Sequence, residues 1–269
     1  MDPLPAHPVP DAIDVTKPHP ARMYDYYLGG KDNWQADQEA AEQILAIAPE
    51  VRAISLANRG FLRRAVTYLA RDKGVTQFLD VGTGIPTSPN VHETAAAHAE
   101  GTRVVYADND PVIHAHANAL LTGAGTTRII LADLRDPDVI LAAARDFLDF
   151  TKPVALLLVA ILHFVPDAED PAGLVAAFRD ALPPGSFLAL SHGTSDFHPA
   201  DVTSTAASTY DSATAPLVLR PREAIETFLA GFTAEPPGLV QAPLWHPDTE
   251  PKPADLEKIG LYAAVAAKN

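Results

Sequence analysis

The chain has 269 residues, enough for one large domain with a substantial apolar core. Its 34 acidic residues outnumber its 20 basic residues, giving a formal net charge of −14, and no nucleic-acid partner is expected, because phosphate contacts need clustered lysine and arginine. The absence of cysteine excludes thiolate nucleophiles, cysteine-ligated zinc and disulfides, and it agrees with a cytoplasmic location. The longest apolar run, residues 154–165, is too short to span a bilayer, so no membrane partner is expected.

The N-terminal part differs in composition from the remainder. Residues 1–19 are rich in proline and poor in large apolar side chains, which predicts a flexible tail. Residues 20–74 have helical patterns and precede the first β-rich run, so we expect an N-terminal helical addition. Residues 75–269 then form the main domain.

The helical addition opens with the unusual segment PARMYDYYLGGKDNW. Pro20 suits the first turn of a short helix, and the glycine pair that starts at Gly29 suits a left-handed cap at its end. We expect Asp32 or Asn33 to cap a second helix, which stops at Pro49.

From residue 76 onward, β-rich runs alternate with helical patterns. Five runs are apolar along nearly their whole length, as in strands covered on both faces of a parallel sheet: 77–81, 103–108, 127–132, 154–161 and 186–192. Three of the helices between them are predicted by a capping carboxylate before a proline, at Asp110, Asp136 and Asp170. This order predicts a doubly wound α/β sheet.

The end of the chain departs from this alternation. A helix is predicted at 221–231, followed by two late strands at 238–245 and 260–268. We expect these strands to form an antiparallel pair at the edge of the sheet, which then has seven strands with the last one reversed.

A glycine turn follows the first strand. The turn GTG begins at Gly82, where ligands bind in doubly wound sheets, above the carboxyl ends of the strands. Alone this signal is weak, but Asp80, Asp108 and Asp133 lie at the ends of three successive strands. Because those ends share one edge of a parallel sheet, we expect the three carboxylates to face one crevice.

The spacing of these acids indicates an adenosine site. Asp108 follows the turn at about the distance of a ribose-binding acid, and Asp133 could accept a hydrogen bond from an adenine amino group. The third glycine of a G-x-G-x-x-G turn is absent, since the chain continues through Pro86. That disfavours a pyrophosphate cradle, and hence an NAD(P)-dependent oxidoreductase, but an adenosine without phosphate needs no such cradle.

These motifs resemble a known class of enzyme. FLDVGTG, VVYADNDP and LADLRDP resemble motifs of class I S-adenosylmethionine (SAM)-dependent methyltransferases. ARMYDYYLGGKDNW, GTGIPTSPNVHE and LLLVAILHFVPD together resemble an actinobacterial family of S-adenosyl methyltransferases, formerly a domain of unknown function. The resemblance implies a Rossmann-like sheet, SAM as cofactor and S-adenosylhomocysteine (SAH) as product, but it identifies no acceptor.

The resemblance also implies roles for individual residues. Gly82, Thr83 and Gly84 would lie against the methionine part, Asp80 near its ammonium, Asp108 at the ribose, Asn109, Asp133 and Leu134 at the adenine, and Ala160 with Ile161 on the floor. We further expect residues 20–34 to close over the crevice as a lid that excludes water. In that lid, Arg22 would meet the methionine carboxylate and Tyr24 would lie near the cofactor.

The reaction itself needs little from the protein beyond alignment of the reactants. His163 is a candidate base if the acceptor must lose a proton, although a purely structural role is equally compatible with its position after a strand. For His192 a structural role is favoured, and no metal site is expected among the scattered histidines. We expect a small-molecule acceptor, because the acidic composition disfavours nucleic acids. A non-catalytic SAM- or SAH-binding protein is the alternative, and the oligomeric state is open.

Overall fold

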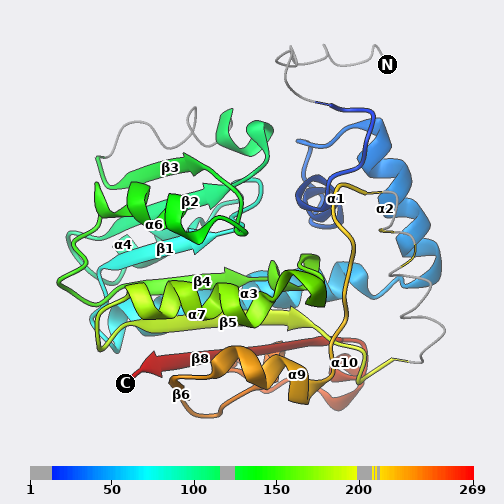
Figure 1. Ribbon diagram of the computed structural model, residues 1–269. Coiled ribbons are helices and arrows are strands. Elements are labelled where there is room, and N and C mark those ends of the chain that lie inside the picture. Colours follow the sequence, from blue (N-terminus) through cyan, green and yellow to red (C-terminus); the bar gives the residue numbers. More distant parts are fainter. Residues whose placement is uncertain (1–13, 116–124, 199–207, 209, 211–212) are drawn as a thin grey trace.

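The computed structural model describes residues 14–115, 125–198, 208, 210 and 213–269. One sheet of eight strands forms its centre, in the order β3-β2-β1-β4-β5-β8-β6, with β7 paired to β8 (Figure 1). The strands are β1 (Gln77–Val81), β2 (Arg103–Asp108), β3 (Thr127–Leu131), β4 (Ala155–Val159), β5 (Phe187–Gly193), β6 (Phe232–Ala234), β7 (Val240–Gln241) and β8 (Leu261–Lys268).

The direction of the strands confirms the predicted doubly wound sheet. β1 to β5 are parallel, and β8 lies antiparallel to β5, β6 and β7. The reversed last strand was expected, and β7 lies within the late strand expected at 238–245, whereas the eighth strand, the three-residue β6, was not expected.

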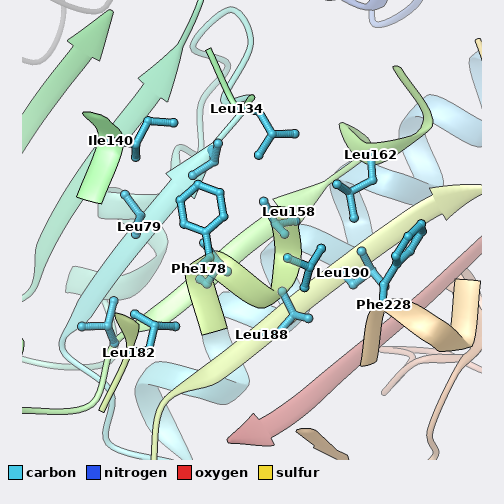
Figure 2. Packing of buried hydrophobic residues seen from close by; sticks show 14 of the residues in the cluster. Leu79, Leu134, Ile140, Leu158, Leu162, Phe178, Leu182, Leu188, Leu190 and Phe228 are labelled. Atoms are coloured by element: carbon cyan, nitrogen blue, oxygen red, sulfur yellow. The ribbon is translucent and has the colours of Figure 1, made fainter. Parts of the chain in front are cut away.

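Side chains alternate between two apolar clusters, one on each face of the sheet. In β4, Leu156 and Leu158 point to one cluster and Leu157 to the other, as the two-residue period of a strand requires. On the first face, Phe178 packs among leucines of the strands (Figure 2). Burial on both faces explains why these strands are apolar throughout.

Helices cover both faces of the sheet. α6 (Pro137–Arg145) and α7 (Pro171–Ala181) lie on one face, and α3 (Val51–Arg71) and α4 (Val91–Ala96) on the other (Figure 1). The predicted caps hold in part: Asp170 accepts from Gly173 N at 3.0 Å at the start of α7, while Asp136 makes no side-chain capping bond. The helix expected after Asp110 runs into residues 116–124, which lie outside the described residues.

Two short helices lie beyond the carboxyl ends of β1 to β5. They are α1 (Pro20–Tyr27) and α2 (Gln35–Ile47), and both pack with α3 (Figure 1). The short segments that complete the description are η1 (Leu162–Phe164), η2 (Asp167–Glu169), α9 (Arg222–Glu226), η3 (Thr227–Leu229), η4 (Ala242–Leu244) and α10 (Pro253–Leu256).

The cap of the second helix was predicted wrongly. Gly29 adopts the expected left-handed conformation with φ +79°, but the cap of α2 is Trp34 rather than Asp32 or Asn33. Those two residues are used by the preceding turn, where Asp25 accepts from Asp32 N at 2.9 Å and from Asn33 Nδ2 at 2.8 Å.

The late strand expected at 238–245 was also wrong in length. Only Val240–Gln241 is extended, because η4 follows at once and places Trp245 in the core. The edge of the sheet is instead formed by Phe232–Ala234, just beyond the predicted helix, which ends at Leu229.

Candidate active site

A cavity of ≈ 840 Å³ opens at the carboxyl ends of the parallel strands. Its walls come from the ends of β1, β2 and β4, from the loops after β3 and β5, and from α1 and α3. All the predicted cofactor-site residues line it: Arg22, Tyr24, Asp80, Gly82, Thr83, Gly84, Asp108, Asn109, Asp133, Leu134, Ala160 and Ile161. The candidate base His163 lines it as well.

The glycine turn after β1 is compact and needs its first glycine. Gly82 has φ +74°, and a Cβ at this position would lie 2.4 Å from Cγ1 of Ile161. Gly84 also has a positive φ of +67°, but open space surrounds its missing Cβ. Gly82 is therefore required by packing as well as by conformation, whereas Gly84 is required by conformation alone.

Asp108 is held by the backbone of this turn. Its Oδ2 accepts from Gly84 N at 2.9 Å, and its Oδ1 accepts from Asp110 N at 3.0 Å. Burial raises the pKa of Asp108 to about 6, although these backbone donors favour the carboxylate. The carboxylate thus has a fixed position beside the turn, as an acceptor for ligand hydroxyls must have.

Asp80 lies at the end of β1, below the same turn. Thr83 Oγ1 donates to its Oδ2 at 3.0 Å, and burial raises its pKa to about 7. The positive charge of Arg59 opposes that shift. Arg59 comes from α3, lines the cavity, and donates through Nη2 to Thr87 O at 2.6 Å and Pro89 O at 3.0 Å. Sequence reasoning missed this cation, because nothing distinguishes it from the other arginines of the helix.

The predicted adenine side is a small polar network. Asn109 Nδ2 donates to Asp133 Oδ2 at 2.7 Å, and Arg135 donates to the same carboxylate through N and Nη1. Although burial raises the pKa of Asp133, these hydrogen bonds and the Arg135 charge lower it overall. Arg135 also donates to Phe164 O at 3.2 Å, which ties this loop to the segment after β4. Leu134 is buried beside the network.

The floor of the cavity contains an unusual backbone conformation. Ala160 has φ +56°, which is uncommon for a residue other than glycine. Its N–H donates to both Ser191 O at 3.1 Å and Ser191 Oγ at 2.9 Å. This turn brings Ile161 against Gly82.

α1 contacts the acids of the crevice through one buried arginine. Nε of Arg22 donates to Asp110 Oδ2 at 2.9 Å, and Nη1 lies 3.9 Å from Asp37 Oδ2. The guanidinium is therefore already paired, and its role toward a methionine carboxylate stays a prediction. The Tyr24 hydroxyl donates to Ser55 O at 2.9 Å and accepts from Asn58 Nδ2 at 3.0 Å.

The hydrogen bond of His163 restricts what this side chain can do. Its Nδ1 accepts from Gly193 N at 3.2 Å, and burial, with His192 and Arg220 nearby, lowers its pKa well below the usual range. The neutral ring then carries its proton on Nε2 and has no free lone pair. In this arrangement His163 can donate a hydrogen bond but cannot accept a proton, so its role as a base stays a prediction that needs this bond to break.

Arg220, a second residue missed from the sequence, holds the segment that carries His163. It donates to Leu162 O at 3.1 Å, to Val165 O at 2.7 Å and to Asp167 Oδ1 at 2.6 Å. It also lies 3.0 Å from His192 Nε2, and His192 Nδ1 lies 2.6 Å from Gly193 O. Both ring nitrogens of buried His192 are thus occupied, in agreement with the structural role expected for it.

The described residues include neither a metal-binding cluster nor a membrane-spanning helix. They contain no group of three or more histidine or acidic side chains that could hold a metal ion. None of the helices in the described ranges is both long and apolar enough to cross a membrane.

The strand order, the reversed β8, the glycine turn and the acid at the end of β2 define a class I SAM-dependent methyltransferase fold. The N-methyltransferase NodS from Bradyrhizobium japonicum, solved with SAH, has this fold, with a TM-score of 0.51 at 14% identity over 92% of this chain and 98% of that one. The chain belongs to the S-adenosyl methyltransferase family, whose model matches residues 6–269. SAM is accordingly its cofactor and methyl transfer its reaction, rather than hydride transfer.

Two solved structures are much more similar to this chain. A DUF574 family protein from Streptomyces avermitilis has 43% identity and a TM-score of 0.89, over 95% of this chain and 99% of that one. A candidate methyltransferase from Thermobifida fusca has 36% identity and a TM-score of 0.89, over 95% of this chain and 97% of that one. A search of curated proteins found no match.

Proposed function

We propose that the cavity binds SAM at its β1–β2 end and transfers the methyl group to a small molecule held in the remaining space. The observation that supports this most directly is the Asp108 carboxylate, which is fixed by Gly84 N at the wall of a cavity of ≈ 840 Å³. Pockets for ligands of drug size measure about 300–1,000 Å³, so a cavity of this volume leaves room beside one bound nucleoside.

The residues present fit SAM. Asp108 can accept hydrogen bonds from ribose hydroxyls, while Asn109 and Asp133 offer polar atoms to an adenine and Leu134 offers an apolar surface. Gly84 has open space where a side chain would stand, which lets a ligand approach the backbone closely. Asp80, lying below the turn, would balance the ammonium group of the methionine part.

Two cations could hold the methionine carboxylate. Arg22 was expected from the sequence, but its guanidinium is paired with Asp110. Arg59 lines the same cavity next to Asp80, and within the described residues it forms no salt bridge. We therefore favour Arg59 for the carboxylate and assign Arg22 to positioning α1 against Asp110.

When bound, SAM supplies an activated methyl group on a sulfonium, and the protein contributes alignment of the acceptor with that carbon. α1 and α2 lie over the strand ends and would exclude water from the site, as the proposed lid requires. Met23 and Tyr27 of α1 are buried in an apolar cluster with α2, so closure would move these two helices together.

The cytoplasmic location and the actinobacterial origin stay predictions. The two similar proteins from Streptomyces and Thermobifida agree with an actinobacterial origin.

Calorimetric titration with SAM and SAH tests the proposal. The Asp108→Asn variant keeps the shape of the side chain but removes the charge, and we expect affinity to fall about tenfold or more, because a charged hydrogen bond contributes about 1.5–3 kcal/mol. Asp138→Asn, at an exposed position on α6, is the matched control. Unchanged SAH affinity in the Asp108 variant would contradict the assignment, and no SAH binding by the wild-type chain would contradict the proposed function.

A further inference from the structure

Part of the cavity extends away from the proposed cofactor site, between the start of α3 and the ends of β5 and β8. Its wall is mainly apolar and includes Ile44, Val51, Ile54, Phe164, Leu219 and Leu261. An acceptor that fills this space must present an apolar body.

Two titratable side chains, Glu50 and His198, form a pair in this apolar wall. Glu50 is the residue before α3, and its Oε1 lies 3.8 Å from Nδ1 of His198. The two side chains are 18% and 15% exposed. Apart from this pairing, the Glu50 carboxylate accepts no hydrogen bond within the described residues, so it offers lone pairs to a ligand.

The position of the His198 ring is fixed by close packing on its other side. A Cβ at Gly260 would lie 2.8 Å from Nε2 of His198, so the ring lies directly against the backbone that precedes β8. That Nε2 is buried and has no hydrogen-bond partner among the residues that the structure describes. The ring therefore has a fixed position on one side of the Glu50 carboxylate.

Three arginines line the cavity away from Glu50, and Lys17, which also lines it, precedes α1. Arg22 is paired with Asp110, Arg59 lies beside Asp80, and Arg135 is paired with Asp133, so all three belong to the cofactor end. Within the described residues, no lysine or arginine forms an ion pair with Glu50. This part of the cavity therefore offers a half-buried negative charge that a cationic ligand would balance and an anionic ligand would oppose.

We propose that the methyl acceptor is an apolar amine whose nitrogen binds at the Glu50 carboxylate, an inference that rests on the proposed function. The amine enters as its ammonium and gives one proton to Glu50, which frees the nitrogen lone pair. That lone pair forms the new bond to the methyl carbon as the carbon–sulfur bond breaks, and its electron pair stays on sulfur to leave neutral SAH. The product leaves as the N-methylated ammonium, and Glu50 returns its proton to solvent.

Glu50 favours an amine over an alcohol or a carboxylic acid. An alcohol would leave the half-buried carboxylate without a counter-charge, and a carboxylate ligand would add a second negative charge. Only the amine both compensates the charge and provides a nucleophilic nitrogen after a single proton transfer.

Three probes that share one apolar body test the inference: phenethylamine, phenethyl alcohol and hydrocinnamate. Each is titrated calorimetrically into the full-length protein saturated with SAH, after SAH binding itself has been measured. We expect phenethylamine to bind about tenfold or more tightly than hydrocinnamate, as expected for one charged hydrogen bond. Glu50→Gln should remove that preference and leave the affinity for the alcohol unchanged, while Glu100→Gln, at an exposed turn, should alter nothing.

The outcomes separate this inference from the proposed function. If SAH binds but the three probes do not differ, or if Glu50→Gln retains the preference for the amine, the amine inference is overturned and the cofactor site stands. If SAH fails to bind, both are overturned. Glu50→Lys provides a second variant, because reversing the charge should reverse the preference toward hydrocinnamate.

Discussion

The hydroxyl of Tyr24 on α1 accepts a hydrogen bond of 3.0 Å from Asn58 Nδ2 on α3 and so connects the N-terminal helix to the floor of the cavity. The connection continues because Asn58 Oδ1 accepts from Ser191 Oγ at 2.6 Å. Ser191 Oγ in turn accepts from the N–H of Ala160, the residue with φ +56°. One buried amide thus links α1, α3, β5 and the strained turn after β4.

We expect Asn58→Ala to destabilise the protein by about 1–3 kcal/mol, because the Ser191 hydroxyl loses its acceptor and the Tyr24 hydroxyl loses one of its two partners. SAH affinity should fall as well, since the support of Ala160 is weakened. Tyr24→Phe removes only the hydrogen bonds at the α1 end of this connection. It should therefore lower both the free energy of unfolding and the SAH affinity by less than Asn58→Ala does. Urea unfolding and calorimetry measure the two effects, and equal effects from both variants would show that the connection is not centred on Asn58.

The two glycines of the turn provide a matched pair of variants. Gly82→Ala places a methyl group against Ile161 as well as requiring a positive φ, so we expect it to abolish measurable SAH binding. Gly84→Ala meets no protein atom, so it should lower the stability of the free protein only by the backbone strain, about 1–2 kcal/mol, while its methyl group takes up part of the space through which the ligand approaches the backbone. Combining Gly82→Ala with Ile161→Ala should restore part of the binding, and no restoration would count against the packing explanation.

SAM affinity should rise with pH. Burial raises the pKa of Asp80 to about 7 and that of Asp108 to about 6, so both carboxyls are partly protonated in the free protein below neutral pH. A cationic ligand favours the ionised form, which means that binding releases protons and strengthens between about pH 5 and pH 8. Calorimetry in buffers of different ionisation enthalpy counts the protons released. Asp80→Asn should remove the step near neutral pH, and a pH-independent affinity would contradict the assignment.

The same shift predicts how stability depends on pH in the absence of ligand. The folded-state pKa of Asp80, about 7, is above its ordinary value of 3.8, so the folded chain holds a proton that the unfolded chain has lost. The contribution of the Asp80 carboxyl to the free energy of unfolding is fully present below its ordinary pKa of 3.8. That contribution is lost as pH rises through the folded-state pKa of about 7. Urea unfolding of wild type and Asp80→Asn across this range measures the contribution as the difference in slope.

Arg220 should matter for stability through its carbonyl contacts rather than through its ion pair. Its side chain is buried and donates to Leu162 O and Val165 O, whereas the side chain of Asp167 is 81% exposed. We expect Arg220→Met to cost about 2–4 kcal/mol, because the buried Val165 carbonyl loses the guanidinium donor and the buried Leu162 carbonyl loses one of its two donors. Asp167→Asn should cost under about 1 kcal/mol. Thermal and urea unfolding compare the two, and a larger loss in the Asp167 variant would reverse the explanation.

The amino-acid sequence by itself determined the sheet and the position of the crevice. β1 and β2 occupy the predicted ranges 77–81 and 103–108, because long apolar runs bounded by turns have few other stable arrangements. The carboxyl ends of these adjacent parallel strands lie on one edge, so Asp80 and Asp108 had to meet there. Short edge strands were less predictable, since the three residues of β6 are too few to show a period.

Only the tertiary structure decided which side chains support and complete the crevice. Asn58 and Ser191 are 133 residues apart, and Arg22 and Asp110 are 88 apart, so no local pattern pairs them. In the sequence, nothing distinguishes Arg59 of α3, or Glu50 just before it, from other charged residues. Both line the cavity because α3 packs on the sheet. The periodicity of apolar residues indicates which face of a helix or strand is buried. The partner of a polar side chain instead depends on which distant elements meet, and the packing of the whole chain determines where they meet.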